Sequence, residues 1–138
     1  MNNGGILGSQ RGESLDATSL LWNGGGTLNY QLGGASDSLN LSGALTKGTG
    51  SAFVFSFANN GIGSGEVFNL VTFSTLSGFT ASDFSYTGSG VTGTFLLDAN
   101  RLQFVAAVVP ESSTLGLAIL GAVFIPFALR QAARRQLN

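Results

Sequence analysis

The sequence predicts a mainly β protein: short glycine-punctuated strands form a β-solenoid end or a small β-sandwich, and one C-terminal transmembrane α-helix follows. Three observations predict this class. Apolar and polar residues alternate along most of the chain, glycine-rich runs separate the alternating stretches, and a continuous apolar run lies near the C-terminus. The chain has 138 residues, of which 21 are Gly and 11 are Phe, and it has no Cys and no His.

The alternation has a period of two residues and is clearest at Phe53, Phe55 and Phe57, which are separated by Val54 and Ser56. Because successive side chains of a strand point to opposite faces, this spacing gives a strand one apolar and one polar face. Glycine and asparagine accept positive φ and form tight turns between such runs. We therefore expect about six or seven strands within residues 27–109, and no helix before the C-terminal tail.

The two β architectures stay open at this point, because many short strands with regular glycine turns suit both. A solenoid usually shows an internal repeat. The chain contains two loosely similar segments, Gly-Thr-Leu-Asn-Tyr-Gln-Leu-Gly at residues 26–33 and Asp-Ser-Leu-Asn-Leu-Ser-Gly at residues 37–43.

Residues 1–26 are expected to be a poorly ordered or truncated N-terminal segment. They contain no basic run and no apolar stretch of the roughly 7 to 15 residues that a secretory signal needs. We therefore expect the chain to be the C-terminal fragment of a longer exported protein. The alternatives are a start site that misses an upstream signal, and a tail-anchored cytoplasmic protein of inverted topology.

The tail contains 18 residues without a charged side chain, from Ser112 to Leu129. A helix of that length reaches about 27 Å, close to the ~30 Å hydrocarbon core of a bilayer. This predicts a transmembrane helix at about residues 112–130, with a buried helix of a soluble domain as the alternative. The basic tail, residues 130–135, follows the span. By the positive-inside rule, its arginines determine the topology and place the C-terminus in the cytoplasm and residues 1–111 outside. These arginines are Arg130, Arg134 and Arg135.

A short polar motif precedes this span, and the order of motif, apolar run and arginines resembles a PEP-CTERM sorting signal over residues 110–138. The motif residues are Pro110, Glu111, Ser112, Ser113 and Thr114. Ser112 departs from the family pattern, which has a second proline at that position. The resemblance implies recognition and processing by exosortase, a membrane-embedded cysteine protease. It also implies a destination at the cell surface or extracellular matrix of exopolysaccharide-making Gram-negative bacteria. The motif residues would be substrate residues.

The body, residues 27–109, resembles the end of autotransporter-associated β-strand repeat proteins. The similarity extends back to about residue 20 and rests on four segments: residues 21–28, 36–43, 68–73 and 78–84. These proteins are long Gly-, Thr- and Asn-rich β-helices. The resemblance implies that the chain forms the last coils and cap of a longer passenger.

The composition excludes several kinds of site. Without His and Cys the chain has no Ser-His-Asp or Cys-His arrangement and no His- or Cys-based metal site. Residues 1–111 carry three positive and seven negative side chains, so they lack the excess of positive charge that is typical of nucleic-acid-binding proteins. Paired carboxylates stay possible in principle, and we interpret the four candidates as ordinary turn residues: Asp37, Glu66, Asp83 and Asp98. A partial calcium-repeat pattern at residues 33–37 is interpreted in the same way.

We therefore expect no catalytic, cofactor-binding or metal-binding residues and no enzyme activity. The expected function is that of an exported structural or adhesive protein of the cell surface or extracellular matrix. A single transmembrane helix would hold it in the inner membrane until an exosortase-like protease sorts it. The membrane, that protease and an exopolysaccharide would be its partners. The alternatives are the end of an exported polysaccharide-acting β-helix enzyme, and an unprocessed single-pass membrane protein.

Overall fold

The structure is a computed structural model that describes residues 1–8 and 11–107. These residues are mainly β, with 53% of them in strands. The first strands are β1 (Ile6–Leu7), β2 (Ser14–Ala17) and β3 (Leu20–Trp22). The next are β4 (Thr27–Gly33), β5 (Ser38–Leu41) and β6 (Ala44–Lys47). They are followed by β7 (Phe53–Asn60), β8 (Val67–Thr72) and β9 (Thr75–Ser77). The last elements are the 3-10 helix η1 (Ala81–Asp83), β10 (Phe84–Thr87), β11 (Gly93–Leu97) and β12 (Arg101–Ala106).

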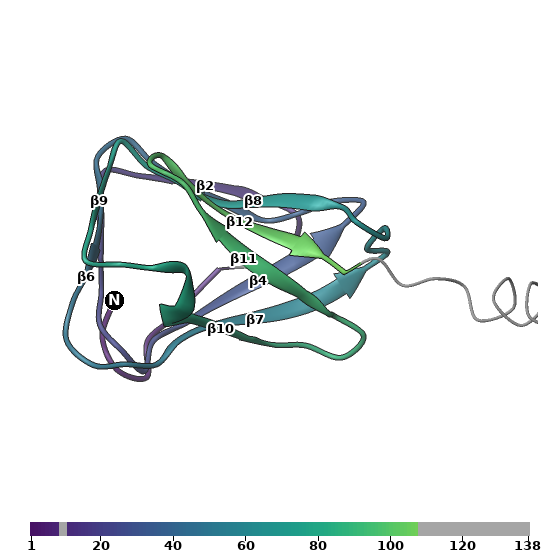
Figure 1. Cartoon of the computed structure of the whole chain (residues 1–138), viewed down its shortest axis with the longest axis horizontal. Helices are drawn as coiled ribbons and strands as arrows, with labels where there is room; N and C mark the ends of the chain where they lie inside the picture. Colours follow the sequence, from purple (N-terminus) through teal and green to yellow (C-terminus); the bar gives the residue numbers. More distant parts are fainter. Residues whose placement is uncertain (9–10, 108–138) are drawn as a thin grey trace, which may run out of the picture. The chain divides into compact units, whose positions relative to one another are not determined.

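The strands form three sheets, and the chain visits them in a fixed order. Sheet A has the order β1-β4-β7-β10, sheet B the order β11-β12-β8-β5-β2, and sheet C the order β3-β6-β9. Each circuit adds one parallel strand to sheets A, B and C in turn. In Figure 1 sheet C stands at the left, sheet B at the top and sheet A at the bottom. Winding of this kind is the arrangement of a β-solenoid rather than of a two-layered β-sandwich.

The winding ends in an antiparallel hairpin. After three coils, β10 adds to sheet A, β11 and β12 then pair antiparallel with each other, and β12 pairs antiparallel with β8 of sheet B. The Phe95 ring on β11 lies 5.5 Å from the Phe55 ring, 5.8 Å from the Phe84 ring and 6.5 Å from the Phe57 ring, measured between centroids. Those three residues belong to sheet A, so the hairpin reaches across the interior and covers it. We call the hairpin β11–β12 the C-terminal cap.

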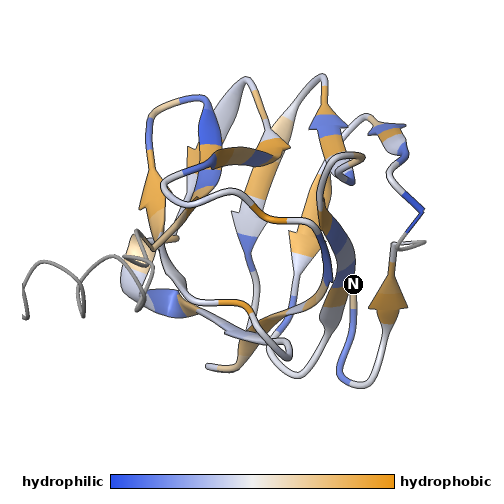
Figure 2. Ribbon diagram, turned by 90° about the vertical axis from the view of Figure 1, so that its right-hand side faces the viewer, coloured by the Kyte–Doolittle hydropathy of each residue, from blue (hydrophilic) through white to orange (hydrophobic). Residues whose placement is uncertain are grey.

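Aromatic side chains fill the interior between the three sheets. Phe53 and Phe55 on β7 are fully buried and Phe57 is 4% exposed, and the side chains between them are only partly buried. Figure 2 shows the same alternation of hydrophobic and hydrophilic residues along the strands. Trp22 is fully buried, with its ring in edge contact with the Phe53 ring at 5.6 Å. Burial of each such side chain favours folding by about 1.5–3 kcal/mol, which explains how a body with few charges holds together.

Short ladders align the corners of successive coils. At the corner between sheets C and A, the Gly4 N–H donates to Gly25 O at 2.9 Å, and the Gly25 N–H donates to Ala52 O at 2.7 Å. At the corner between sheets A and B, Gly33 has φ +134, and a Cβ there would lie 2.0 Å from Asn60 O of the next coil. Only glycine fits this position, because the backbones of adjacent coils approach closely.

The fold-class prediction is wrong as stated, because the predicted fold includes a C-terminal transmembrane helix. Within residues 1–8 and 11–107 the structure has three sheets, its only helix is the three-residue η1, and no helix is long and apolar enough to cross a membrane. The span expected at residues 112–130 lies outside the described residues. Its strictly apolar part, residues 115–129, would reach only about 22 Å as a helix, so length alone was a weak basis for the prediction.

The N-terminal segment contains regular strands. Residues 1–26 are expected to be a poorly ordered or truncated segment, whereas the structure has β1, β2 and β3 there, and Met1–Ala107 forms one compact unit. These strands were missed because they are short and take their order from pairing with the next coil. Residues 27–107 hold nine strands, more than expected, and η1 was not expected at all. Strands of three or four residues, such as β9, give too little alternation to recognise.

Candidate binding surface on sheet B

The buried carboxylate of Asp37 has a structural role. The side chain is 3% exposed. Its Oδ1 accepts a hydrogen bond from the Glu13 N–H at 2.7 Å, and its Oδ2 accepts one from the Gln31 N–H at 2.5 Å. The carboxylate therefore joins the first coil to the second. Both oxygens of this carboxylate, which belongs to the partial calcium-repeat pattern of residues 33–37, accept backbone hydrogen bonds, and no cluster of three or more His, Cys, Asp or Glu exists in the described part of the chain.

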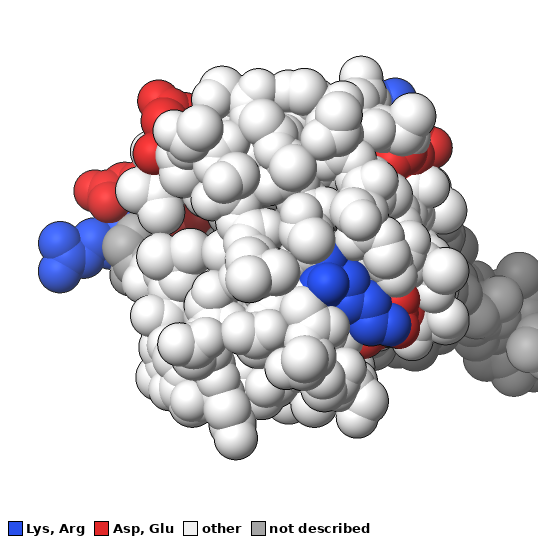
Figure 3. Space-filling model, turned by 90° about the vertical axis from the view of Figure 1, so that its left-hand side faces the viewer, with Lys and Arg blue, Asp and Glu red and all other residues white. Residues whose placement is uncertain are grey.

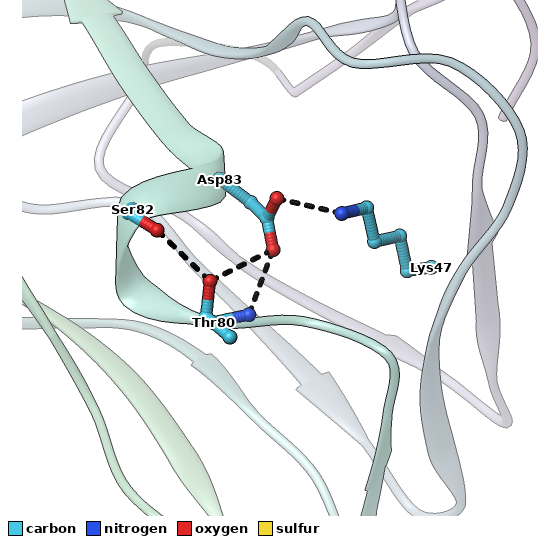
Figure 4. Close-up of polar contacts among 4 residues, drawn as sticks. All are labelled: Lys47, Thr80, Ser82 and Asp83. Carbon is cyan, nitrogen blue, oxygen red and sulfur yellow. Dashed lines mark hydrogen bonds and ion pairs between the residues drawn. The ribbon is translucent and has the colours of Figure 1, made fainter.

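Asp83, the last residue of η1, is held by contacts from Lys47 on β6 and from Thr80 at the start of η1 (Figure 4). Lys47 on β6 places its Nζ 2.6 Å from Asp83 Oδ1, and the Thr80 N–H donates to Oδ2 at 2.8 Å. The hydrogen bond from Lys47, together with that from the Thr80 backbone, lowers the pKa of Asp83 below its ordinary value. A carboxylate whose ionised form is stabilised in this way is poorly suited to donate a proton as a catalytic acid.

The two remaining acidic candidates make local contacts. Asp98 Oδ2 lies 3.1 Å from Arg101 Nε at the β11–β12 turn. Glu66 Oε2 accepts a hydrogen bond from the Gly63 N–H at 2.8 Å, within the loop between β7 and β8. Across residues 1–8 and 11–107, none of the four candidates is hydrogen-bonded to another. Each of the four is instead engaged in contacts of its own.

The outward face of sheet B carries a ladder of hydrogen-bonded polar side chains. At its centre, Asn40 Nδ2 donates to Ser14 Oγ at 2.7 Å and to Asp16 Oδ1 at 3.0 Å. Asn40 Oδ1 accepts a hydrogen bond from Thr72 Oγ1 at 3.1 Å. We call these side chains and their neighbours the polar ladder; it comprises Ser14, Asp16, Ser38, Asn40, Asn69, Thr72 and Gln103. The ladder fixes the orientation of groups that an exposed sheet would otherwise leave free to rotate.

Two shallow hollows lie on this side of the molecule and share Leu41 as a common wall. One is lined by Asp16, Ala17, Thr18, Asn40, Leu41 and Ser42. The other is lined by Leu41, Asn69, Thr72, Phe73, Ser74, Asn100 and Arg101. Together they cross the sheet from β2 to β12, and we call them the sheet B groove. Its hydroxyl, amide, carboxylate and guanidinium groups provide both donors and acceptors of hydrogen bonds.

The side of the body on which sheet C lies carries few charges, as the mostly white face in Figure 3 shows. The predicted sorting residues Pro110 to Thr114 and the predicted topology residues Arg130, Arg134 and Arg135 lie outside the described residues. Sequence reasoning missed the groove. The polar half of the period-two pattern, Asn40 and Asn69 among apolar neighbours, was the signal that could have found it.

In comparisons with known proteins, no family model, no curated protein and no solved structure matches the chain.

Proposed function

We propose that this chain is a structural or adhesive component of a bacterial cell surface or extracellular matrix, and that the sheet B groove binds exopolysaccharide. The supporting observation is the lining of the groove, in which hydroxyl and amide side chains meet one acid and one arginine. A polysaccharide presents many hydroxyl groups, each able to donate and accept, and so matches a surface of mixed donors and acceptors.

The pre-ordered side chains of the polar ladder strengthen this proposal. Asn40 is fixed by its contacts with Ser14, Asp16 and Thr72 before any ligand arrives. Groups that are already ordered lose little conformational entropy on binding, so more of the interaction energy appears as affinity. The groove is shallow and open, which suits a polymer that lies across several strands better than a small molecule that needs enclosure.

The contacts made by the acidic side chains favour an adhesive role over a catalytic one. Asp37, Asp83 and Asp98 all engage in structural contacts. The groove itself contains one carboxylate, Asp16, whereas hydrolysis of a glycosidic bond uses two. Nothing in the described part of the chain favours the alternative of a polysaccharide-acting enzyme.

The test is binding of the full chain to a panel of soluble bacterial exopolysaccharides, measured by affinity electrophoresis. Arg101→Ala and Asn69→Ala remove groove side chains from two neighbouring strands. Loss of a hydrogen bond worth about 1 to 1.5 kcal/mol should weaken binding about 5- to 10-fold in each variant. Ser85→Ala, on the outer face of sheet A, is the matched control and should bind as the unaltered chain does. Equal binding by all four proteins, or binding by none, would contradict the proposal.

We further propose that residues 110–114 are the recognition motif of an exosortase-like protease that sorts the chain to the surface. The support is the order of motif residues, apolar run and arginines in the sequence. Mass spectrometry of the surface-exposed form tests it, since processing should remove Arg134 and Arg135. Their presence on that form, or normal surface delivery of Glu111→Ala, would show that the motif does not serve this purpose.

A further inference from the structure

Four neighbouring strands of sheet B each place one polar residue in a single row across the outward face. Strand pairing sets Asp16 opposite Asn40, Asn40 opposite Thr72, and Thr72 opposite Arg101. All four side chains are exposed or partly buried. Neighbouring strands lie about 4.8 Å apart, so three such steps give a row about 14 Å long that runs perpendicular to the strands.

A second polar row lies beside the first. Ser38 Oγ donates a hydrogen bond to Ser14 Oγ at 3.1 Å, and Gln103 Nε2 donates one to Asn69 Oδ1 at 2.7 Å. Residues two positions apart on a strand point to the same face, so Ser14, Ser38 and Gln103 share the face of the first row. The polar ladder, extended by Arg101, therefore forms two parallel rows, and each of the four strands contributes one residue to each row.

A β-bulge on β8 brings Asn69 into the second row. Asn69 and Thr72 are three positions apart, so in a regular strand they would point to opposite faces. The register between β8 and β12 skips Leu70, and both Leu70 and Val71 are fully buried. A bulge re-aims the side chains on one side of it. This bulge keeps both polar residues on the outward face while two apolar neighbours fill the interior.

The first row has an acceptor of hydrogen bonds at one end and a donor at the other. Thr72 Oγ1 donates to Asn40 Oδ1, and Asn40 Nδ2 donates to Asp16 Oδ1, so the donors within the row all point toward β2. A carboxylate only accepts and a guanidinium only donates. The Arg101 side chain is 49% exposed, so it is accessible to a ligand at the β12 end. A ligand along the row needs both a donor and an acceptor.

We propose that the sheet B groove takes a neutral, extended glycan chain that lies across the strands along these two rows; this rests on the proposed function. In a chain of diequatorially linked hexoses, such as a β-1,4-glucan, each unit advances the chain by nearly the spacing between neighbouring strands. Successive sugar units then meet successive strands. Their hydroxyl groups can donate to Asp16 and accept from Arg101 in the same complex.

The charges of the body disfavour a glycan with an acid on every unit. Residues 1–107 carry six acidic and three basic side chains, a net charge of −3. Asp16 stands in the first row itself, so a polyuronate laid along the row brings a carboxylate against this acid. Like charges brought together suppress binding of the wrong partner. A neutral chain of the same shape has no such conflict.

Three probe polymers separate chain shape from charge in affinity electrophoresis of the full chain. Hydroxyethylcellulose is neutral and extended, dextran is neutral with flexible α-1,6 linkages, and polymannuronate is extended but anionic. Binding to hydroxyethylcellulose should be at least about 10-fold tighter than binding to either of the others. Calorimetry with cello-oligosaccharides measures the footprint. Cellotetraose should bind about 10-fold or more tighter than cellobiose, because it contacts two further strands.

Two matched pairs of variants place the glycan on the rows. Thr72→Val removes a hydroxyl group from the first row and should weaken binding to hydroxyethylcellulose about 5- to 10-fold. Thr87→Val makes the same change on β10 of sheet A and should have no effect. Asp16→Asn should narrow the difference in affinity between polymannuronate and hydroxyethylcellulose. Glu66→Gln changes the net charge equally outside the rows and should leave that difference unchanged. Trp22 fluorescence verifies that each variant is folded.

The outcomes distinguish this inference from the proposed function. Dextran or polymannuronate binding as tightly as hydroxyethylcellulose, or cellobiose binding as tightly as cellotetraose, would overturn the inference and leave a polysaccharide site in place. So would equal effects within either pair of variants, or failure to bind hydroxyethylcellulose by a chain that binds a bacterial exopolysaccharide. Binding to no polysaccharide at all would contradict both.

Discussion

Replacement of Asp37 by Ala should destabilise the whole solenoid, because its carboxylate joins two coils. The substitution removes the acceptor of two backbone N–H groups, those of Glu13 and Gln31. Hydrogen bonds to a charged group contribute about 1.5–3 kcal/mol each. Glu13 is exposed, so water can replace part of its lost bond, whereas Asp37 itself is buried. We therefore expect a loss of about 2–4 kcal/mol in the free energy of unfolding.

Urea denaturation at fixed protein concentration measures this loss, with the fluorescence of Trp22 as the signal. Trp22 is the only tryptophan and is fully buried, so its emission reports unfolding of the core. For a unit of this size, about 2–4 kcal/mol corresponds to a fall in melting temperature of roughly 8–16 °C. Asp98→Ala is the matched control, since it removes an exposed carboxylate and should cost under about 1 kcal/mol. Equal effects of the two substitutions would refute the structural role of Asp37.

Three further substitutions probe other features of the fold. Trp22→Ala should lower the free energy of unfolding by about 3–5 kcal/mol, measured by circular dichroism in urea, because it leaves a cavity among aromatic rings. Gly33→Ala should prevent folding or cost more than about 3 kcal/mol by the same assay, since its Cβ would collide with Asn60 O. Lys47→Met should lower stability at pH 7 by at most about 1 kcal/mol. The lowered pKa of Asp83 means that this contribution is present above the ordinary carboxyl pKa of about 3.9 and is lost as pH falls through the lower folded value, so the two proteins should converge in acid.

Each of these substitutions has a counterpart that should have a smaller effect. Leu21→Ala removes an exposed side chain, so a loss close to that of Trp22→Ala would contradict the core assignment. Gly61→Ala introduces strain at φ +80 but no collision, and should cost only about 1 kcal/mol. Arg101→Met breaks an exposed ion pair and should leave the acid dependence almost unchanged. An acid dependence of Lys47→Met that matches the unaltered chain would show that the Asp83 contact is not formed in solution.

The sequence allowed prediction of the strands whose alternation extends over several residues. β4 and β7 were recognisable because apolar residues at every second position have one buried face to occupy. β1, with two residues, has no such pattern and is ordered by its pairing with β4. Its order is a property of the neighbouring coil rather than of its own residues, which is why the first coil was missed.

The internal repeat was hidden by unequal coil lengths. The separation between paired residues on sheet A grows from 21 positions (Ile6 to Thr27) to 27 (Thr27 to Val54) and 31 (Val54 to Ser85). The pairing aligns Met-Asn-Asn-Gly-Gly-Ile-Leu at residues 1–7 with Trp-Asn-Gly-Gly-Gly-Thr-Leu at residues 22–28. A search for a constant period cannot find this similarity. The polar ladder was harder to predict than the strands, because Asn40 and Thr72 meet only through the pairing of β5 with β8 in sheet B.

The uneven distribution of aromatic rings sets the order in which the chain becomes stable. Of the ten residues in the ring cluster, only Trp22 and Tyr30 precede residue 53, and the others are supplied by the third coil and the elements that follow it. In a stack where each coil depends on its neighbour, stability spreads from the best-packed end. The first coil supplies only Trp22 to this cluster, so its stable order depends on the rings of the third coil and of the hairpin at residues 93–106.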